Sequence, residues 1–357
     1  MNQLHLIALP HTQVSVDFCG CAYTSKILKF CKMMGNDYDI HLYAPEGPDV
    51  EGATLHPCLT NDQRRARFGA DDPNRLPDWP TDAQTLLFNE LVVHEMKPEP
   101  RDLILISGGW THHRVAEAFP QNINCEPGVG YEGIYSNFCA FESYAWMHHV
   151  YAKKGILDGR FFDAVIPNYF DPDDFPLLNP GKGEYLLFLG RIVQRKGPHI
   201  ASEIAERCGL PLRVAGAGGK QVGKDIVAPE VTIRNAEYLG PVNIKERSEL
   251  LAGAKALLVP TTYIEPFGGV AVEAMMCGTP VITTDWGAFS ETVRNGVSGY
   301  KIHTLSDAKI AIEHVSKLNP FSIRAYAKSR YSIQSVRPQF IRWFSQLYSL
   351  FGKGWYQ

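Results

Sequence analysis

Residues 256–283 have the sequence ALLVPTTYIEPFGGVAVEAMMCGTPVIT, which contains two short apolar runs with a glycine-rich segment between them. The first run, Ala256–Pro260, shows no polar alternation, which is typical of a strand buried on both faces. A loop with Glu265 follows, and Gly268-Gly269 begins a stretch that predicts a helix. The second run, Pro280–Thr283, predicts another strand, so the segment resembles one unit of a parallel α/β sheet.

The same alternation of apolar runs and helical stretches extends in both directions. The other predicted strands are Leu4–Leu9, Ile40–Ala44, Leu103–Ile106, Ala164–Pro167, Tyr185–Leu189 and Leu212–Ala215. Helices are predicted at Thr24–Met34 and at Pro198–Cys208, which has Pro at its first position and Gly209 just past its end. The sequence therefore predicts an α/β protein with parallel sheets.

The pattern runs twice, with a segment rich in Pro, Gly, Asn and Asp at residues 168–183 between the two sets. We expect one domain at residues 1–170, joined by a closing helix within residues 336–357, and a second domain at residues 171–335. Residues 45–80 contain prolines, glycines and the basic run Arg64–Arg67, and they are expected to be irregular.

Composition narrows the class of protein. Hydrophobic residues make up 45% and charged residues 20%, and 35 Lys and Arg against 38 Asp and Glu give a net charge of −3. This balance favours a globular protein with no overall attraction to nucleic acid or anionic membrane. The eight cysteines contain no Cys-x-x-Cys pair, which indicates reduced thiols and no zinc site. No signal segment or membrane-spanning run is found, so a cytoplasmic location is expected; oligomeric state stays open.

The segment after Pro260 has the chemistry of a ligand site. Glycines at 268 and 269 allow a ligand to approach the backbone, and the free N–H groups of a helix start bind anions. Glu265 and Glu273 lie at the same mouth. Because phosphates repel carboxylates, these two side chains suit the hydroxyls of a ribose or another sugar; the alternative is that they only favour the helix N-terminus.

A second segment, Gly190-Arg191-Ile-Val-Gln-Arg-Lys196-Gly197, lies between a predicted strand and a predicted helix. Ligands of open α/β sheets bind at the carboxyl ends of the strands. Arg191 and Lys196 there suit a diphosphate, Arg191 through paired hydrogen bonds and Lys196 as a point charge. A solvated basic loop is the alternative interpretation.

Together these segments resemble the donor-binding motifs of retaining glycosyltransferases of family 4, the glycosyl transferases group 1. That family has two glutamates separated by seven residues, as Glu265 and Glu273 are, and Gly-Arg followed by Lys-Gly, as at 190–197. Val165-Ile-Pro-Asn168 resembles the family's inter-domain turn, with Tyr169 in place of glycine, and Gly216-Ala-Gly218 its second glycine-rich turn. The resemblance is specific over residues 163–299.

The resemblance implies a GT-B fold, in which two Rossmann-like parallel-sheet domains face each other across a cleft, with the acceptor mainly on the first. It implies that Arg191 and Lys196 neutralise the donor diphosphate, that Glu265 binds the transferred sugar and that Glu273 binds the ribose. Backbone at Phe267, Gly268, Gly269 and Val270 would line the sugar and phosphates, with Gly190 and Gly216 nearby. No metal or other cofactor is implied.

The first half departs from the family pattern. Where the family has a Gly-Gly loop after the first strand, this chain has Phe18-Cys-Gly20-Cys-Ala, with Gly20 alone. His112 and His113 are candidates for the histidine that the family places on the sugar. Glu126, in Ile123-Asn-Cys-Glu126-Pro-Gly, is a further candidate for this site.

The resemblance implies a glycosyltransferase that moves a hexose from a nucleotide-diphosphate sugar to a hydroxyl, with retention at the anomeric carbon. Family frequency favours UDP-glucose as donor and a glycan, a lipid-linked sugar or a small molecule as acceptor. A hydroxylated or hydroxymethylated DNA base is an alternative acceptor. A non-catalytic nucleotide-sugar-binding protein is an alternative of another class. A nicotinamide-dependent dehydrogenase has only the incomplete Gly216-Ala-Gly218-Gly219 in its favour.

Overall fold

A computed structural model describes residues 3–69, 82–178 and 183–350 of the chain. The chain divides into two compact units. The N-terminal unit comprises Met1–Glu142, Val150–Tyr169 and Val336–Gln357, and the C-terminal unit comprises Ser143–His149 and Phe170–Ser335. Helices α5 (Tyr144–Lys154) and α12 (Ile333–Leu350) each contribute residues to both units.

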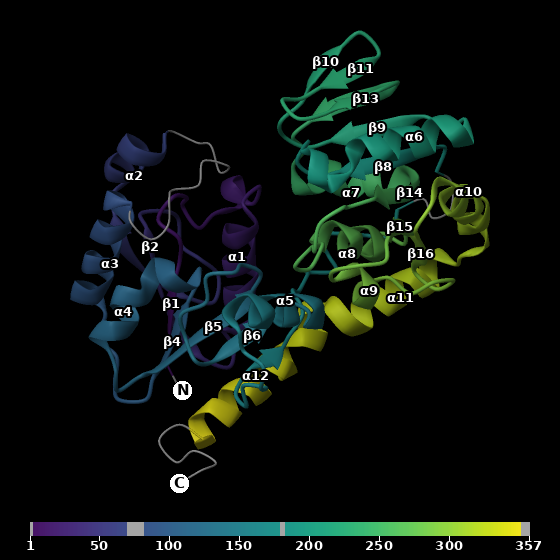
Figure 1. Ribbon diagram of the computed structural model, residues 1–357. Coiled ribbons are helices and arrows are strands. Elements are labelled where there is room, and N and C mark those ends of the chain that lie inside the picture. Colours follow the sequence, from purple (N-terminus) through teal and green to yellow (C-terminus); the bar gives the residue numbers. More distant parts are fainter. Residues whose placement is uncertain (1–2, 70–81, 179–182, 351–357) are drawn as a thin grey trace. The chain divides into compact units, whose positions relative to one another are not determined.

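The N-terminal unit is built on one parallel sheet (Figure 1). In sheet order its described strands are β3 (Thr54–Leu59), β2 (Asp39–Pro45), β1 (Gln3–Ile7), β4 (Leu103–Ile106), β5 (Ile123–Val129), β6 (Cys139–Phe141) and β7 (Ala164–Val165). Its other helices are α1 (Ala22–Met34), α2 (Asn61–Phe68), α3 (Ala83–Glu95) and α4 (His113–Ala118). All four residues of β4 are buried, as expected for a strand covered on both faces.

The C-terminal unit has a second parallel sheet with helices around it (Figure 1). Its described strands, in sheet order, are β13 (Ala236–Gly240), β9 (Leu212–Ala215), β8 (Tyr185–Leu189), β14 (Ala254–Val259), β15 (Val281–Thr284) and β16 (Gly299–Ile302). The helices are α6 (Pro198–Cys208), α7 (Ile244–Gly253), α8 (Gly269–Met276), α9 (Phe289–Thr292), α10 (Leu305–His314) and α11 (Pro320–Tyr331).

A small antiparallel sheet adds to the C-terminal unit after β9. Its strands are β10 (Lys220–Val222), β11 (Asp225–Val227) and β12 (Thr232–Ile233). The side chain of Gln221 joins this sheet to β13, because its Nε2 donates to the carbonyl of Ala236 and its Oε1 accepts from the N–H of Tyr238.

The strand order places a switch point in each sheet. In the C-terminal unit the chain builds from β8 through β9 to β13, then returns to β14 beside β8 and builds the other way. In the N-terminal unit the corresponding pair is β1 and β4. Loops that follow neighbouring strands at such a point diverge to opposite faces of the sheet and leave a crevice where ligands bind.

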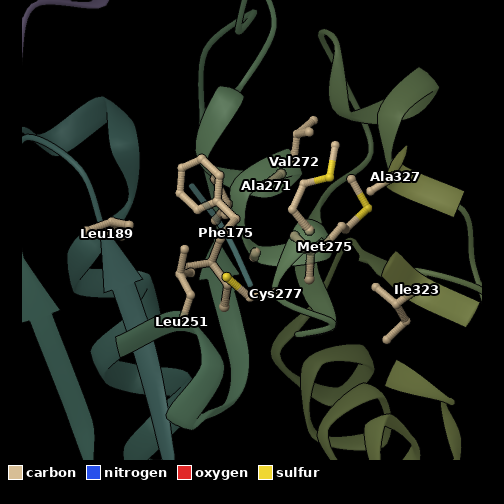
Figure 2. Packing of buried hydrophobic residues seen from close by; sticks show 14 of the residues in the cluster. Phe175, Leu189, Leu251, Ala271, Val272, Met275, Cys277, Ile323 and Ala327 are labelled. Atoms are coloured by element: carbon tan, nitrogen blue, oxygen red, sulfur yellow. The ribbon is translucent and has the colours of Figure 1, made fainter. Parts of the chain in front are cut away.

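Helix α8 is buried along almost its whole length. Figure 2 shows Val272 and Met275 of this helix packed among Phe175, Leu251 and Ile323, all of which belong to one buried cluster. Packing therefore fixes the body of α8, and its N-terminus is the part that meets the carboxyl edge of the sheet.

Part of the region expected to be irregular is regular. Strand β3 and helix α2 both lie within residues 45–69, and the remaining residues 70–81 of that stretch are outside the described ranges. Strand β3 contains Pro57, which is tolerated because β3 is at the edge of the sheet. Helix α2 begins at a capping box, in which Thr60 and Gln63 satisfy each other's backbone N–H groups.

Candidate functional site

Glycines allow the loop after β8 to lie against the ends of two neighbouring strands, β9 and β14. A Cβ on Gly216 would lie 1.9 Å from the carbonyl oxygen of Gly190, so the two turns can be this close only without side chains. Gly197 has φ of 73° and caps α6, and a Cβ there would lie 2.0 Å from the carbonyl oxygen of Pro260. The loop with Arg191 and Lys196 is therefore held against the end of β14.

Lys196 and Glu265 form an ion pair at the carboxyl edge of the C-terminal sheet. Lys196 Nζ lies 2.9 Å from Glu265 Oε2, and the hydroxyl of Tyr263 donates to the same oxygen at 2.6 Å. The Lys196 and Glu265 side chains are only 20% and 11% exposed, so the pair is largely removed from water. Two donors, an ammonium and a hydroxyl, therefore share one oxygen of this shielded carboxylate.

Cations outnumber carboxylates around this pair. Arg191 is exposed on the loop that directly follows β8, and Arg195 precedes Lys196 in the 3-10 helix Gln194–Lys196. The guanidinium of Arg195 lies 4.7 Å from the ring centroid of Tyr263, and Lys196 Nζ lies 5.5 Å from it. The three positive charges of residues 191–196 exceed the charges of Glu265 and of Glu230, whose Oε2 accepts from the N–H of Gln194 at 3.3 Å. The edge is therefore net positive, which suits a ligand with two or more negative charges.

The second glutamate has its own partner. Glu273 lies in α8, and its Oε1 accepts from Arg247 Nη1 of α7 at 2.9 Å. Glu273 is 9% exposed as a residue. The Arg247 pair therefore holds Glu273 in one orientation in the second turn of α8, where its carboxylate can accept a hydrogen bond from a hydroxyl of a ligand.

At the start of α8, backbone N–H groups and not side chains are available to bind a ligand. Gly268 caps the helix with φ of 75°, and a Cβ there would lie 2.2 Å from the ring of Phe289. The Phe267 side chain is 3% exposed and stacks on Phe170 with ring centroids 6.2 Å apart. The N–H groups at Gly269 and Val270 begin the helix and face no preceding turn, so they are the available anion-binding groups.

The loop after β15 supports Glu265 from the other side. The N–H of Ala288 donates to the carbonyl of Glu265 at 3.0 Å, and a Cβ on Gly287 would lie 2.6 Å from the Glu265 nitrogen. Trp286 Nε1 donates to the carbonyl of Thr261 at 2.9 Å. Loops from three adjacent strands thus fix the position of Glu265.

The N-terminal candidates Gly20, His112 and His113 lie in the segments that follow β1 and β4, the two strands at the switch point of the N-terminal sheet. Gly20 is exposed in the turn just before α1, in the loop that follows β1. His113 is partly exposed after β4, where its Nδ1 donates to the carbonyl of Trp110 at 2.8 Å. His112 is completely buried, and its Nδ1 lies 2.6 Å from Asn89 Oδ1. Burial lowers the pKa of His112 to about 3, so this ring is neutral.

Glu126 is fully buried in β5. Its Oε1 accepts from the N–H groups of Tyr135, at 2.6 Å, and Ser136, while Oε2 accepts from the hydroxyl of Tyr131 at 2.8 Å. These bonds anchor the loop after β5. Burial nevertheless dominates and raises the pKa of Glu126 from 4.5 to about 7.

This raised pKa predicts a pH-dependent stability. An acid that binds its proton more tightly when folded stabilises the fold below its unfolded pKa of 4.5, and this stability is lost as the pH rises to about 7. We expect Glu126→Gln to flatten that slope, which is at most about 1.4 kcal/mol per pH unit for one group. Urea unfolding at about pH 5 and about pH 7 measures it.

Glu117→Gln is the matched control, because Glu117 also accepts from a tyrosine, Tyr135, but at 3.2 Å on the surface. The control is expected to keep the wild-type slope. An unchanged slope in Glu126→Gln would mean that Glu126 is ionised in the folded protein at all these pH values.

Sequence reasoning missed three residues of the C-terminal site, which are Arg195, Tyr263 and Arg247. Arg195 and Tyr263 lie inside the quoted motifs, and the signal that could have found them is their proximity to Lys196 and Glu265. Arg247 lies in the charged stretch Lys245–Glu249, which has the composition of a solvated helix face. No described group of three His, Cys, Asp or Glu side chains is arranged to bind a metal.

Comparison with known proteins agrees with the motifs. Residues 170–319 match the family described as glycosyl transferases group 1. A protein of Rhodococcus erythropolis named D-inositol 3-phosphate glycosyltransferase is 37% identical over 151 residues, which is 38% of this chain and 34% of that relative. A Mycobacterium tuberculosis protein of the same name is 34% identical over 143 residues, 37% of this chain and 29% of that relative.

The match spans about a third of the length of these curated relatives. It confirms the predicted resemblance of the C-terminal region to glycosyl transferases group 1.

Solved structures match over nearly the whole chain. AviGT4, a glycosyltransferase involved in avilamycin A biosynthesis, has a TM-score of 0.69 at 18% identity, with 98% of each chain covered. HepE of Anabaena in complex with UDP-glucose has a TM-score of 0.66 at 15% identity, covering 97% of this chain and 100% of that chain. These matches confirm the predicted α/β fold of GT-B type.

No helix within residues 3–69, 82–178 and 183–350 combines the length and the apolar character that crossing a bilayer requires.

Proposed function

We propose that the chain is a retaining glycosyltransferase that moves a hexose from a nucleotide-diphosphate sugar to a hydroxyl group of an acceptor. The observation that carries this proposal is the Lys196–Glu265 pair at the β8–β14 switch point, with Arg191 and Arg195 on the same loop. Cations suit the diphosphate, and a fixed carboxylate beside them suits the sugar hydroxyls. UDP-glucose is the proposed donor, and a glycan or lipid-linked sugar is the proposed acceptor.

The proposed mechanism assigns one role to each charged group at the carboxyl edge of the C-terminal sheet. Lys196 has three N–H donors, so it can keep its bond to Glu265 and also bind a phosphate oxygen. As the bond between the anomeric carbon and the diphosphate breaks, the acceptor oxygen bonds to the same face of that carbon, and the hydroxyl proton passes to the leaving phosphate oxygen. The charge that develops on the leaving diphosphate is neutralised by Lys196, Arg191 and the start of α8. Glu265 orients the sugar during this step, while Glu273 binds the ribose. In this proposal no metal or other cofactor takes part.

The bound UDP-glucose of HepE supports the choice of donor to test. We expect the protein to bind UDP and to hydrolyse or transfer glucose from UDP-glucose. Calorimetry with UDP and GDP, and turnover with a panel of nucleotide sugars, test the donor. NMR of the product tests the stereochemistry, with an α-linked product expected from an α-linked donor.

Two results would overturn the proposal. One is the absence of binding to every nucleoside diphosphate in the panel. The other is a β-linked product, which would show inversion at the anomeric carbon. Binding without any hydrolysis or transfer would favour a non-catalytic nucleotide-sugar-binding protein.

A further inference from the structure

Tyr263 contacts both the acidic and the basic members of the C-terminal site. We propose that Tyr263 is a positioning residue that orients Glu265 through its hydroxyl and, through its ring face, holds Arg195 as a third cation for the donor's phosphates. This inference rests on the proposed function, because it assigns roles within the same site.

The hydroxyl of Tyr263 fixes the rotation of the Glu265 carboxylate. It donates to Oε2 at 2.6 Å, and Lys196 Nζ donates to that same oxygen at 2.9 Å. Two donors on Oε2 determine where the other oxygen, Oε1, points. Burial, together with the nearby Glu265 charge, raises the pKa of Tyr263, so its hydroxyl keeps the proton that it donates.

The ring of Tyr263 has a second role, which is to hold Arg195. The Arg195 guanidinium lies 4.7 Å from the ring centroid, within the range in which a cation is attracted to an aromatic face. Both the N–H and the hydroxyl of Thr262 donate to the Arg195 carbonyl, at 2.9 and 3.2 Å. Backbone and ring together therefore tie the 3-10 helix Gln194–Lys196 to the loop before Glu265.

Arg195 is available for a ligand in this arrangement. Its side chain is exposed, and no carboxylate of the described residues forms an ion pair with it. By contrast, Arg213 also lies over a tyrosine ring, that of Tyr185, but Glu237 neutralises it at 2.9 Å. The five N–H donors of Arg195 are thus available for an anion beside Lys196.

Three variants separate the two roles. Tyr263→Phe keeps the ring and loses the hydroxyl, so we expect turnover to fall about tenfold while the Kd for UDP stays within about twofold. Tyr263→Leu loses the ring as well, so UDP binding should also weaken about fivefold. Arg195→Ala should weaken UDP binding at least as much, and adding Tyr263→Leu to it should cause no further loss of affinity.

The control is a similar contact on α11. Tyr326 has Arg330 over its ring at 4.8 Å, and its hydroxyl donates to the Thr292 carbonyl at 3.3 Å. Tyr326→Phe and Tyr326→Leu remove the same interactions at residues that follow neither β8 nor β14. They are expected to leave turnover and UDP affinity unchanged, while thermal unfolding reports on the fold of every variant.

The outcomes distinguish this inference from the proposed function. Wild-type protein that binds no nucleoside diphosphate overturns both. If the wild-type protein binds UDP and turns over its donor, and Tyr263→Phe has the same turnover, only the positioning role of the hydroxyl is overturned. Unchanged UDP affinity in Arg195→Ala overturns the third cation. If Tyr263→Leu does not fold, Tyr263→Phe still decides the role of the hydroxyl, and Arg195→Ala still decides whether Arg195 is the third cation.

Discussion

We expect Lys196→Ala to weaken nucleoside diphosphate binding by about 10- to 150-fold and to lower turnover by at least as much. The reason is the loss of a charge-assisted contact to phosphate, worth about 1.5–3 kcal/mol. The substitution also leaves the Glu265 carboxylate, only 11% exposed, with Tyr263 as its remaining donor among the contacts described here. Turnover therefore suffers twice, through the phosphate and through the orientation of Glu265.

Steady-state kinetics and UDP calorimetry measure the two losses separately. Arg213→Ala is the control, because Arg213 also forms a 2.9 Å ion pair in the C-terminal unit, with Glu237, but lies within β9 and not at its carboxyl end. The control is expected to behave like wild type. Wild-type kinetics of Lys196→Ala with saturating donor would show that Lys196 does not bind the diphosphate.

The strands that the sequence predicted best are the ones buried on both faces. Leu103–Ile106, Tyr185–Leu189 and Leu212–Ala215 were each predicted with the bounds that the structure has. In a parallel sheet covered by helices, most side chains of such a strand meet the core, so the apolar run itself marks the strand; Arg213 of β9 is an exception. Helix α6 was predicted equally well, because Pro198 and Gly209 mark its two ends.

The sequence did not predict features that depend on contacts between residues far apart in the chain. Strand β3 contains Pro57 and has exposed residues, so only its place at the sheet edge explains why it is a strand. The partner of Glu273 is Arg247, 26 positions away on another helix. No spacing rule connects these two positions. They meet because α7 and α8 pack together beside β14.

The histidines illustrate a different limit. His112 and His113 are adjacent in sequence, but one is completely buried and the other partly exposed. The sequence could name the loop after β4 but could not say which ring faces inward, because that depends on packing against Asn89 of α3. Both stay candidates by position, and the described contacts place His112 in the packed interior.

Substitution of Glu265 and of Glu273 should affect UDP binding and turnover differently. We expect Glu273→Gln to weaken UDP binding about tenfold, because the ribose hydroxyls that it binds are present in every form of the nucleotide. We expect Glu265→Gln to leave UDP affinity unchanged or slightly higher, because UDP lacks the transferred sugar and Lys196 is released from an ion pair. Its turnover should instead fall about a hundredfold, since its contact strengthens as charge develops at the anomeric carbon.

The different partners of the two side chains make this comparison sharp. Glu265 shares Oε2 with Lys196 and Tyr263 in the loop before α8, whereas Glu273 is held by Arg247 within the helix. Calorimetry with UDP beside turnover with UDP-glucose measures both effects, and Glu237→Gln is the control for loss of a paired carboxylate. If Glu265→Gln loses UDP affinity and Glu273→Gln does not, the two roles are reversed. If neither changes binding or turnover, this edge of the sheet is not the donor site.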